Sequence, residues 1–133
     1  MKFDLVTPCK TCPFRTDRTF PLTVARVREI LSALFDRDQT FSCHGTVDYA
    51  AIEERGEDMH DEGYRHIPGA EEQHCAGAMV LLEKSGRANQ MMRIAERLGF
   101  YDHKRLKMDA PVFASRDAMV KAFQKLNRRK AKT

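Results

Sequence analysis

The sequence predicts a small, mostly α-helical domain with at most a short two-stranded sheet. Three observations lead to this prediction. Apolar residues recur at helical spacing in several segments, whereas extended segments are few and short, at residues 2–6 and 40–42. The length of 133 residues suits one ordinary domain and not two. We therefore expect residues 1–120 to form a single domain, followed by a basic helix end and tail at residues 121–133.

The first and last helices carry clear start signals. Thr23 is a suitable N-cap for a helix over residues 24–35, in which apolar residues repeat every three or four positions. Ser115 is a suitable N-cap for the last helix, which presents Met119 and Phe123 on its apolar face.

Two further helices are expected between these. Residues 76–84 are apolar on most sides, which is typical of a buried central helix, and Gly86 suits its C-terminal end. Residues 87–98 should form the next helix. Its buried face is predicted to consist of Met91, Ile94, Ala95 and Leu98.

Residues 47–72 differ in composition from the rest of the chain. They contain nine acidic residues and only two basic ones. We expect a solvated, mobile acidic loop there, with a turn of helix over residues 49–54.

The compartment that the sequence suggests is the cytoplasm. No apolar run approaches the length of a membrane span, and the first residues do not resemble a secretion signal. A reducing compartment favours metal binding or redox chemistry over disulfides for the four cysteines, which are Cys9, Cys12, Cys43 and Cys75.

The spacing of these cysteines predicts one shared metal centre. Cys9 and Cys12 lie three positions apart in a turn that Pro13 follows, so both thiols can face one ion. Cys43 lies in a loop, and Cys75 precedes a helix whose N-terminal dipole should favour its thiolate. Two alternatives remain: four unrelated buried cysteines, or a thioredoxin-like dithiol at the first pair.

The sequence leaves two candidates for the metal, a 4Fe-4S cluster and zinc. A single close pair with two isolated cysteines suits a cluster, whose corners accept ligands from unrelated loops. Structural zinc sites more often use two close pairs, although His44 and His74 offer imidazole nitrogens beside two of the cysteines. A 4Fe-4S cluster on the four thiolates is favoured, with one zinc ion as the alternative.

Three residues near the cysteines are candidates for a supporting role. His44 and His74 are alternate ligands or hydrogen-bond partners of the ligands. Arg15 is expected to lower thiol pKa values or to donate to nearby carbonyls.

The motifs around the cysteines resemble those of a group of small phage and bacterial proteins of unknown function. The resemblance rests on Cys9-Lys-Thr-Cys12-Pro-Phe-Arg15, Phe41-Ser-Cys43-His44 and His74-Cys75-Ala-Gly77, and it covers roughly residues 8–113. It implies metal binding and no transferable activity. The ligand pattern alone is also similar to that of iron–sulfur uracil-DNA glycosylases.

Positive charge is concentrated at the C-terminal end of the chain. The net charge is +4, but residues 121–133 contain six basic residues and no acidic one, so the rest of the chain is slightly acidic. This segment could contact nucleic acid or a protein partner. The residues predicted to make nucleic-acid contacts are Lys125, Arg128, Arg129 and Lys130.

Two classes of function follow from these patterns. The favoured one is a non-enzymatic, metal-centred regulator or adaptor, because no catalytic constellation accompanies the cysteines. The alternative is an iron–sulfur or dithiol redox protein or enzyme that uses the cysteine centre.

Overall fold

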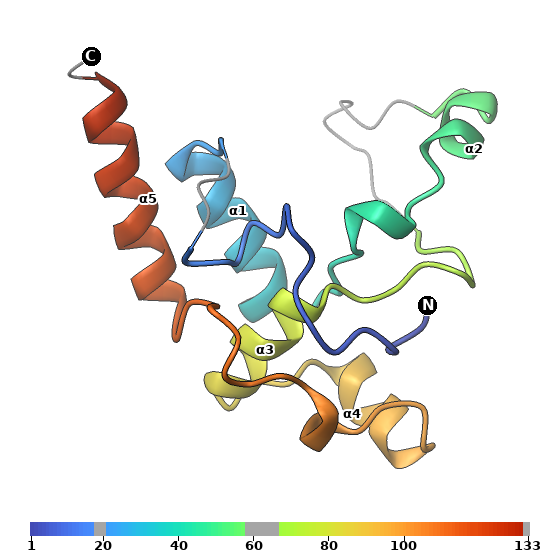
Figure 1. Cartoon of the computed structure of the whole chain (residues 1–133). Helices are drawn as coiled ribbons and strands as arrows, with labels where there is room; N and C mark the ends of the chain where they lie inside the picture. Colours follow the sequence, from blue (N-terminus) through green and yellow to red (C-terminus); the bar gives the residue numbers. More distant parts are fainter. Residues whose placement is uncertain (18–20, 58–66, 132–133) are drawn as a thin grey trace.

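The computed structural model describes residues 1–17, 21–57 and 67–131, and the described part is mostly helical (Figure 1). This confirms the predicted class of a small helical domain. Backbone pairing outside helices consists, in these ranges, of isolated bridges between Lys2 and Gln73, Arg15 and Val112, and Ser42 and His74. The helices are α1 (Val24–Phe35), η1 (His44–Thr46), α2 (Tyr49–Glu54), α3 (Ala76–Lys84), α4 (Gln90–Arg97), η2 (His103–Arg105) and α5 (Arg116–Ala131).

Local capping explains where the outer helices begin. The Thr23 hydroxyl accepts a hydrogen bond from the Arg26 amide at 3.1 Å, and α1 starts at the next residue, as predicted. The Ser115 hydroxyl accepts from the Ala118 amide at 3.1 Å, which starts α5. Both caps satisfy amides that the first turn of a helix leaves without partners.

Helix α3 forms the centre of the fold, and its bounds agree with the prediction. All its residues from Ala76 to Leu82 are buried, and it crosses the middle of the molecule (Figure 1). The helix ends at Lys84, and Gly86 follows with a φ of +65°, a left-handed conformation that glycine adopts without strain. The cysteine at its N-terminal end is therefore placed next to the core.

Helix α4 differs from the prediction both in its first residue and in its buried face. It begins at Gln90 rather than at residue 87, because the Asn89 side chain caps it by accepting from the Met92 amide at 2.8 Å. Its buried residues are Met92 and Ala95. The predicted buried face was largely wrong, since Met91, Ile94 and Leu98 are 45%, 40% and 64% exposed.

Helices α1 and α5 lie side by side and run antiparallel (Figure 1). At one end, Arg116 of α5 forms an ion pair with Asp36, which follows α1. At the other end, the Asn127 side-chain amide donates to the Leu22 carbonyl at 3.4 Å. Buried Val27, Leu31, Met119 and Phe123 belong to one apolar core.

The acidic segment contains more helix than a simple loop. Helix α2 covers residues 49–54, as predicted, and the Asp48 side chain caps it through the Ala51 amide. Residues 58–66, which fall in the predicted mobile loop, lie outside the described residues, so its mobility stays a prediction. In the parts of the chain that are described, no helix is both long and apolar enough to cross a membrane.

Candidate metal centre

The N-terminal cysteine pair lies on a tight turn. The Cys12 amide donates to the Cys9 carbonyl at 3.2 Å, and the Arg15 amide donates to the Cys12 carbonyl at 3.3 Å. Phe14, which is fully buried, holds this turn against the core. Cys12 is buried and Cys9 is half-buried, so the turn presents one thiol inward and leaves the other partly accessible.

The other two cysteines are held by pairing between two short extended segments. The Cys43 amide donates to the Gln73 carbonyl at 2.8 Å, and the Cys75 amide donates to the Phe41 carbonyl at 2.7 Å. This antiparallel pairing fixes Cys43 and Cys75 on neighbouring strands of backbone. Both are buried.

The N-terminal turn meets the start of α3 at a sulfur–sulfur contact. Cys12 Sγ lies 3.6 Å from Cys75 Sγ, although the two residues are 63 positions apart. Gly77 makes this approach possible, because a Cβ atom at that position would lie 2.3 Å from Cys12 Sγ. The contact therefore depends on a residue without a side chain in the first turn of α3.

The remaining sulfurs are near enough to influence one another electrostatically. The pKa of Cys43 responds to the charges of Cys9 and Cys12, and the pKa of Cys75 responds to that of Cys43. The four sulfurs are nevertheless loosely arranged. No three of the cysteine sulfurs in the described ranges all lie within 4.8 Å of one another, whereas the ligand atoms of Glu96, Asp102 and His103 do.

The contact between Cys12 and Cys75 shifts the pKa values of the two thiols in opposite directions. The hydrogen bond from Cys75 lowers the pKa of Cys12, and so do peptide amides and the charge of Arg15. The hydrogen bond to Cys12, together with burial, raises the pKa of Cys75 well above 9.0. The amide of Ala78 in the first turn of α3 acts on the Cys75 pKa in the expected, lowering direction, but the hydrogen bond with Cys12 and burial outweigh it.

Backbone amides point at the three buried sulfurs. Hydrogen bonds from the peptide groups of Phe14 and Gly77 lower the pKa of Cys12. The Gly45 peptide group acts on Cys43 and that of Ala78 acts on Cys75 in the same direction. On Cys43 burial is the larger effect, and it raises the pKa. Such amides stabilise negative charge on sulfur once a proton is replaced by a metal.

Arg15 supports the turn as the sequence suggested. Its guanidinium donates to the Cys9 carbonyl at 3.3 Å and forms an ion pair with Asp17 at 2.8 Å. Its charge also contributes to the lowered pKa of Cys12. Arg15 therefore fixes the shape of the turn and brings positive charge close to it.

The two histidines use their ring nitrogens in different ways. His44 Nδ1 lies 2.9 Å from the Tyr49 hydroxyl. His74 is fully buried. Its Nε2 lies 3.0 Å from the side-chain amide of Asn89, and its Nδ1 lies 3.2 Å from the Cys75 carbonyl. Since the Asn89 side-chain oxygen accepts from the Met92 amide, its nitrogen donates to His74 Nε2, so Nδ1 carries the proton.

Burial lowers the pKa of His74 to about 4, which agrees with this neutral form. His74 thus holds the backbone at Cys75 through hydrogen bonds, and it draws Asn89 into the core. Sequence reasoning missed Asn89 and Gly77 as site residues. The position of Asn89 just before a helix was an available signal for a cap, whereas nothing local marks the space that Cys12 needs at Gly77.

The predicted nucleic-acid contacts lie elsewhere, on α5. Lys125, Arg128 and Arg129 are exposed. The side chain of Lys130 falls outside the described side chains.

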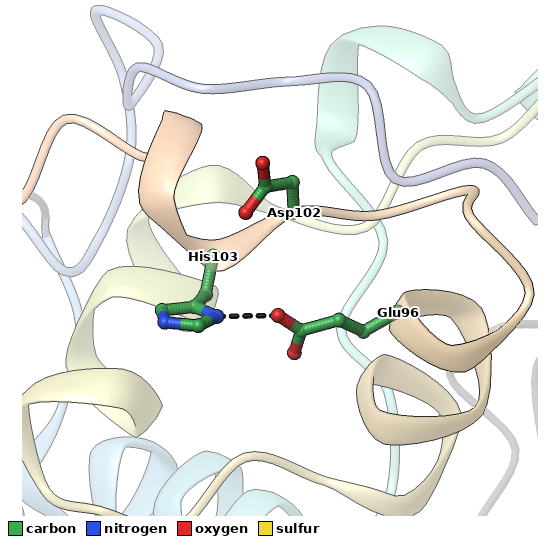
Figure 2. Close-up of side chains that lie close together, drawn as sticks. All are labelled: Glu96, Asp102 and His103. Carbon is green, nitrogen blue, oxygen red and sulfur yellow. Dashed lines mark hydrogen bonds and ion pairs between the residues drawn. The ribbon is translucent and has the colours of Figure 1, made fainter.

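The group formed by Glu96, Asp102 and His103 joins the end of α4 to η2 (Figure 2). His103 Nδ1 contacts the Glu96 carboxylate, and this contact raises the pKa of His103. Asp102 caps η2 by accepting from the Lys104 amide at 3.0 Å. Asp102 and His103 are exposed and Glu96 is half-buried, and the three side chains have a structural use as an ion pair and a cap.

Comparison of the chain with models of protein families, with curated proteins and with solved structures found no match. The resemblance to small phage and bacterial proteins therefore stays a prediction.

Proposed function

We propose that this chain is a metal-binding module in which Cys9, Cys12, Cys43 and Cys75 hold one metal centre. The observation that carries the proposal is the contact between Cys12 and Cys75, at 3.6 Å. Cys43 is close enough to affect the pKa of Cys75, and Cys9 is close enough to affect the pKa of Cys43. Three distant segments meet there: the N-terminal turn, the loop at Cys43 and the start of α3.

The surroundings of the sulfurs support metal binding over four unrelated buried cysteines. A buried thiolate without compensation is costly, and here peptide amides of Phe14, Gly45 and Ala78 are directed at sulfur. Hydrophobic burial of a neutral cysteine needs no such donors. Donors of this kind are what a metal-bound thiolate requires to hold its charge and orientation.

Two occupants fit such a centre, and different features favour each. Zinc–sulfur bonds of about 2.3 Å in a tetrahedron place sulfurs about 3.8 Å apart, close to the Cys12–Cys75 separation. The looser arrangement of the other sulfurs suits the larger 4Fe-4S cluster, whose thiolate ligands attach to different iron atoms.

The role that fits either occupant best is to organise the fold. Four protein sulfurs close the coordination shell, which is the arrangement of structural rather than catalytic zinc. The centre would tie α3 to both the N-terminal turn and the segment before η1, and metal-binding energy would add to folding energy. We therefore propose a non-enzymatic module, a regulator or adaptor.

One observation favours a redox function as the second candidate. Cys9 is half-buried, whereas the other three cysteines are buried. An oxidant or a partner thiol would reach the centre through Cys9 first. In a redox protein this sulfur would be oxidised and reduced reversibly, whereas in a structural centre its oxidation would only release the metal.

The test is metal analysis of the full-length chain purified without oxygen, with an absorption spectrum of the same sample. We expect either four iron atoms with a brown colour or one zinc ion without colour, per chain. Cys43→Ser should remove most of the metal, and Ser42→Ala, which changes the neighbouring side chain alone, should retain it. Cys9→Ser, at the accessible position, provides a second variant in case loss of Cys43 prevents folding.

A chain that contains neither iron nor zinc would contradict the proposal. So would a Cys43→Ser protein that keeps its full metal content. Reversible one-electron reduction of bound iron, with full retention of metal, would favour the redox candidate over the structural one.

A further inference from the structure

The outer face of α5 carries a stripe of positive charge. Lys121, Lys125, Arg128 and Arg129 are all exposed. Within the described part of the chain, no ion pair is formed by any of the four. The single acidic residue of α5, Asp117, lies in its first turn.

The helical register separates this stripe from the core. With 3.6 residues per turn, Lys121, Lys125 and Arg128 lie within about 60° of one another and opposite Met119 and Phe123. Met119 and Phe123 are 0% and 2% exposed and belong to the core that α5 shares with α1. The helix is therefore anchored by one face while the other is free to meet a partner.

The two ends of α5 are held in place, so the stripe is preorganised. Arg116 is bonded to Asp36 at the first turn, and Asn127 is bonded to the Leu22 carbonyl near the last. From Lys121 to Arg129 the helix rises about 12 Å, which places several cations along a rigid rod. A rigid array loses less conformational entropy on binding than a flexible tail does.

We infer that this face of α5 binds the phosphate backbone of nucleic acid. The stripe is cationic throughout, and the large apolar side chains that are exposed in the described residues lie on other elements. Protein interfaces are instead rich in aromatic and methionine side chains and poor in lysine. Insertion into a membrane surface requires an exposed apolar helix face, and in α5 that face is buried against α1.

The same residues indicate that binding would be independent of the nucleotide sequence. Phe123, the aromatic residue that lies between these cations in the sequence, is buried in the core, so no exposed aromatic side chain is available beside them for base stacking. Binding by phosphate contacts alone is insensitive to sequence and strongly dependent on salt. A duplex, with its higher charge density, should bind at least as tightly as a single strand.

The experiment is fluorescence anisotropy of a labelled duplex and a labelled single strand with the purified full chain, over a series of salt concentrations. The test variant combines Lys121→Gln, Lys125→Gln and Arg128→Gln. The matched control combines Lys104→Gln, Arg105→Gln and Lys107→Gln, three exposed positions in and next to η2. Both variants lose three positive charges, and glutamine retains helix propensity in α5.

The inference predicts measurable duplex binding at low salt. The α5 variant should bind at least about tenfold more weakly at 50 mM salt, with a salt slope lower by about three. The control should change the affinity by less than about threefold. The absence of duplex binding, or equal losses in the two variants, would overturn the inference. Binding of labelled polyglutamate as tight as that of the duplex would also overturn it and would point to an acidic protein.

Discussion

Gly77 and Cys12 occupy adjoining space, and the missing side chain of one makes room for the sulfur of the other. A Cβ atom on Gly77 would lie 2.3 Å from Cys12 Sγ and 3.2 Å from Phe14 Cβ. Both neighbours are buried and neither is the end of a long, flexible side chain. The packing of the N-terminal turn on α3 therefore depends on glycine at this position.

Gly77→Ala should loosen the candidate metal centre. The added methyl group must displace Cys12 or α3, at a cost of about 1–3 kcal/mol. We expect a lower melting temperature and weaker metal retention against a chelator. The matched control is Gly45→Ala, because a Cβ at Gly45 meets nothing within 4 Å and the amide near Cys43 is kept. If the two variants behave alike, the close approach of Cys12 to α3 is not important for the centre.

Asn89→Ala should destabilise the fold more than the loss of an ordinary helix cap does. The change removes the cap on the Met92 amide and leaves His74 Nε2 buried without its donor. The combined loss should be about 2–3 kcal/mol in the free energy of unfolding. Denaturant titration measures it, with Gln90→Ala at the exposed neighbouring position as the control. A loss below that of an ordinary exposed cap would contradict the role assigned to the buried pair.

The ion pair between Asp36 and Arg116 predicts a pH dependence of stability. Arg116 holds the pKa of Asp36 below its usual value of 3.8 through a hydrogen-bonded ion pair. The stabilisation is therefore present above pH 3.8 and is lost as the pH falls through the lower, folded-state pKa.

Asp36→Asn should lower the melting temperature at neutral pH, and the variant and the parent should converge in acid below pH 3.8. Asp109→Asn removes an exposed carboxylate outside this contact and serves as the control. A difference in melting temperature that stays constant down to low pH would show that the ion pair does not carry the effect.

His103 should titrate above its usual pKa of 6.5. The hydrogen bond that His103 Nδ1 donates to the Glu96 carboxylate is the main cause, and Asp102 makes a smaller contribution (Figure 2). The stabilisation is fully present below pH 6.5 and is lost as the pH rises through the higher, folded-state pKa. Nuclear magnetic resonance of the His103 ring protons measures that pKa directly.

Glu96→Gln should return the His103 pKa toward 6.5, and Asp102→Asn should shift it less. Equal shifts in the two variants would mean that the contact in Figure 2 does not dominate the titration.

Local signals predicted most of the helices. Thr23 and Ser115 are caps that act on amides three residues away, so their effect is visible in a short stretch of sequence. The face of α4 was mispredicted because two sets of residues fit helical spacing, one at positions 91, 94 and 98 and the other at Met92 and Ala95. Of the predicted residues, Ala95 is buried and the others are exposed. The choice between them depends on burial of Asn89 against His74, which is a contact between distant segments.

The sequence allowed the candidate cysteines to be chosen, but it did not allow their geometry to be predicted. Cysteine spacing singles out Cys9, Cys12, Cys43 and Cys75, because the type of residue carries the chemistry. The contact between Cys12 and Cys75 depends on the pairing of residues 41–43 with 73–75 and on the space at Gly77. Neither is encoded in any one segment.

The most direct test of the central claim is X-ray absorption at the edge of whichever metal the purified chain contains. The proposal predicts a first shell made of sulfur only, at about 2.3 Å, with four sulfurs for zinc and additional iron neighbours for a cluster. A first shell of nitrogen and oxygen would contradict it, because the metal would then lie away from the four cysteines.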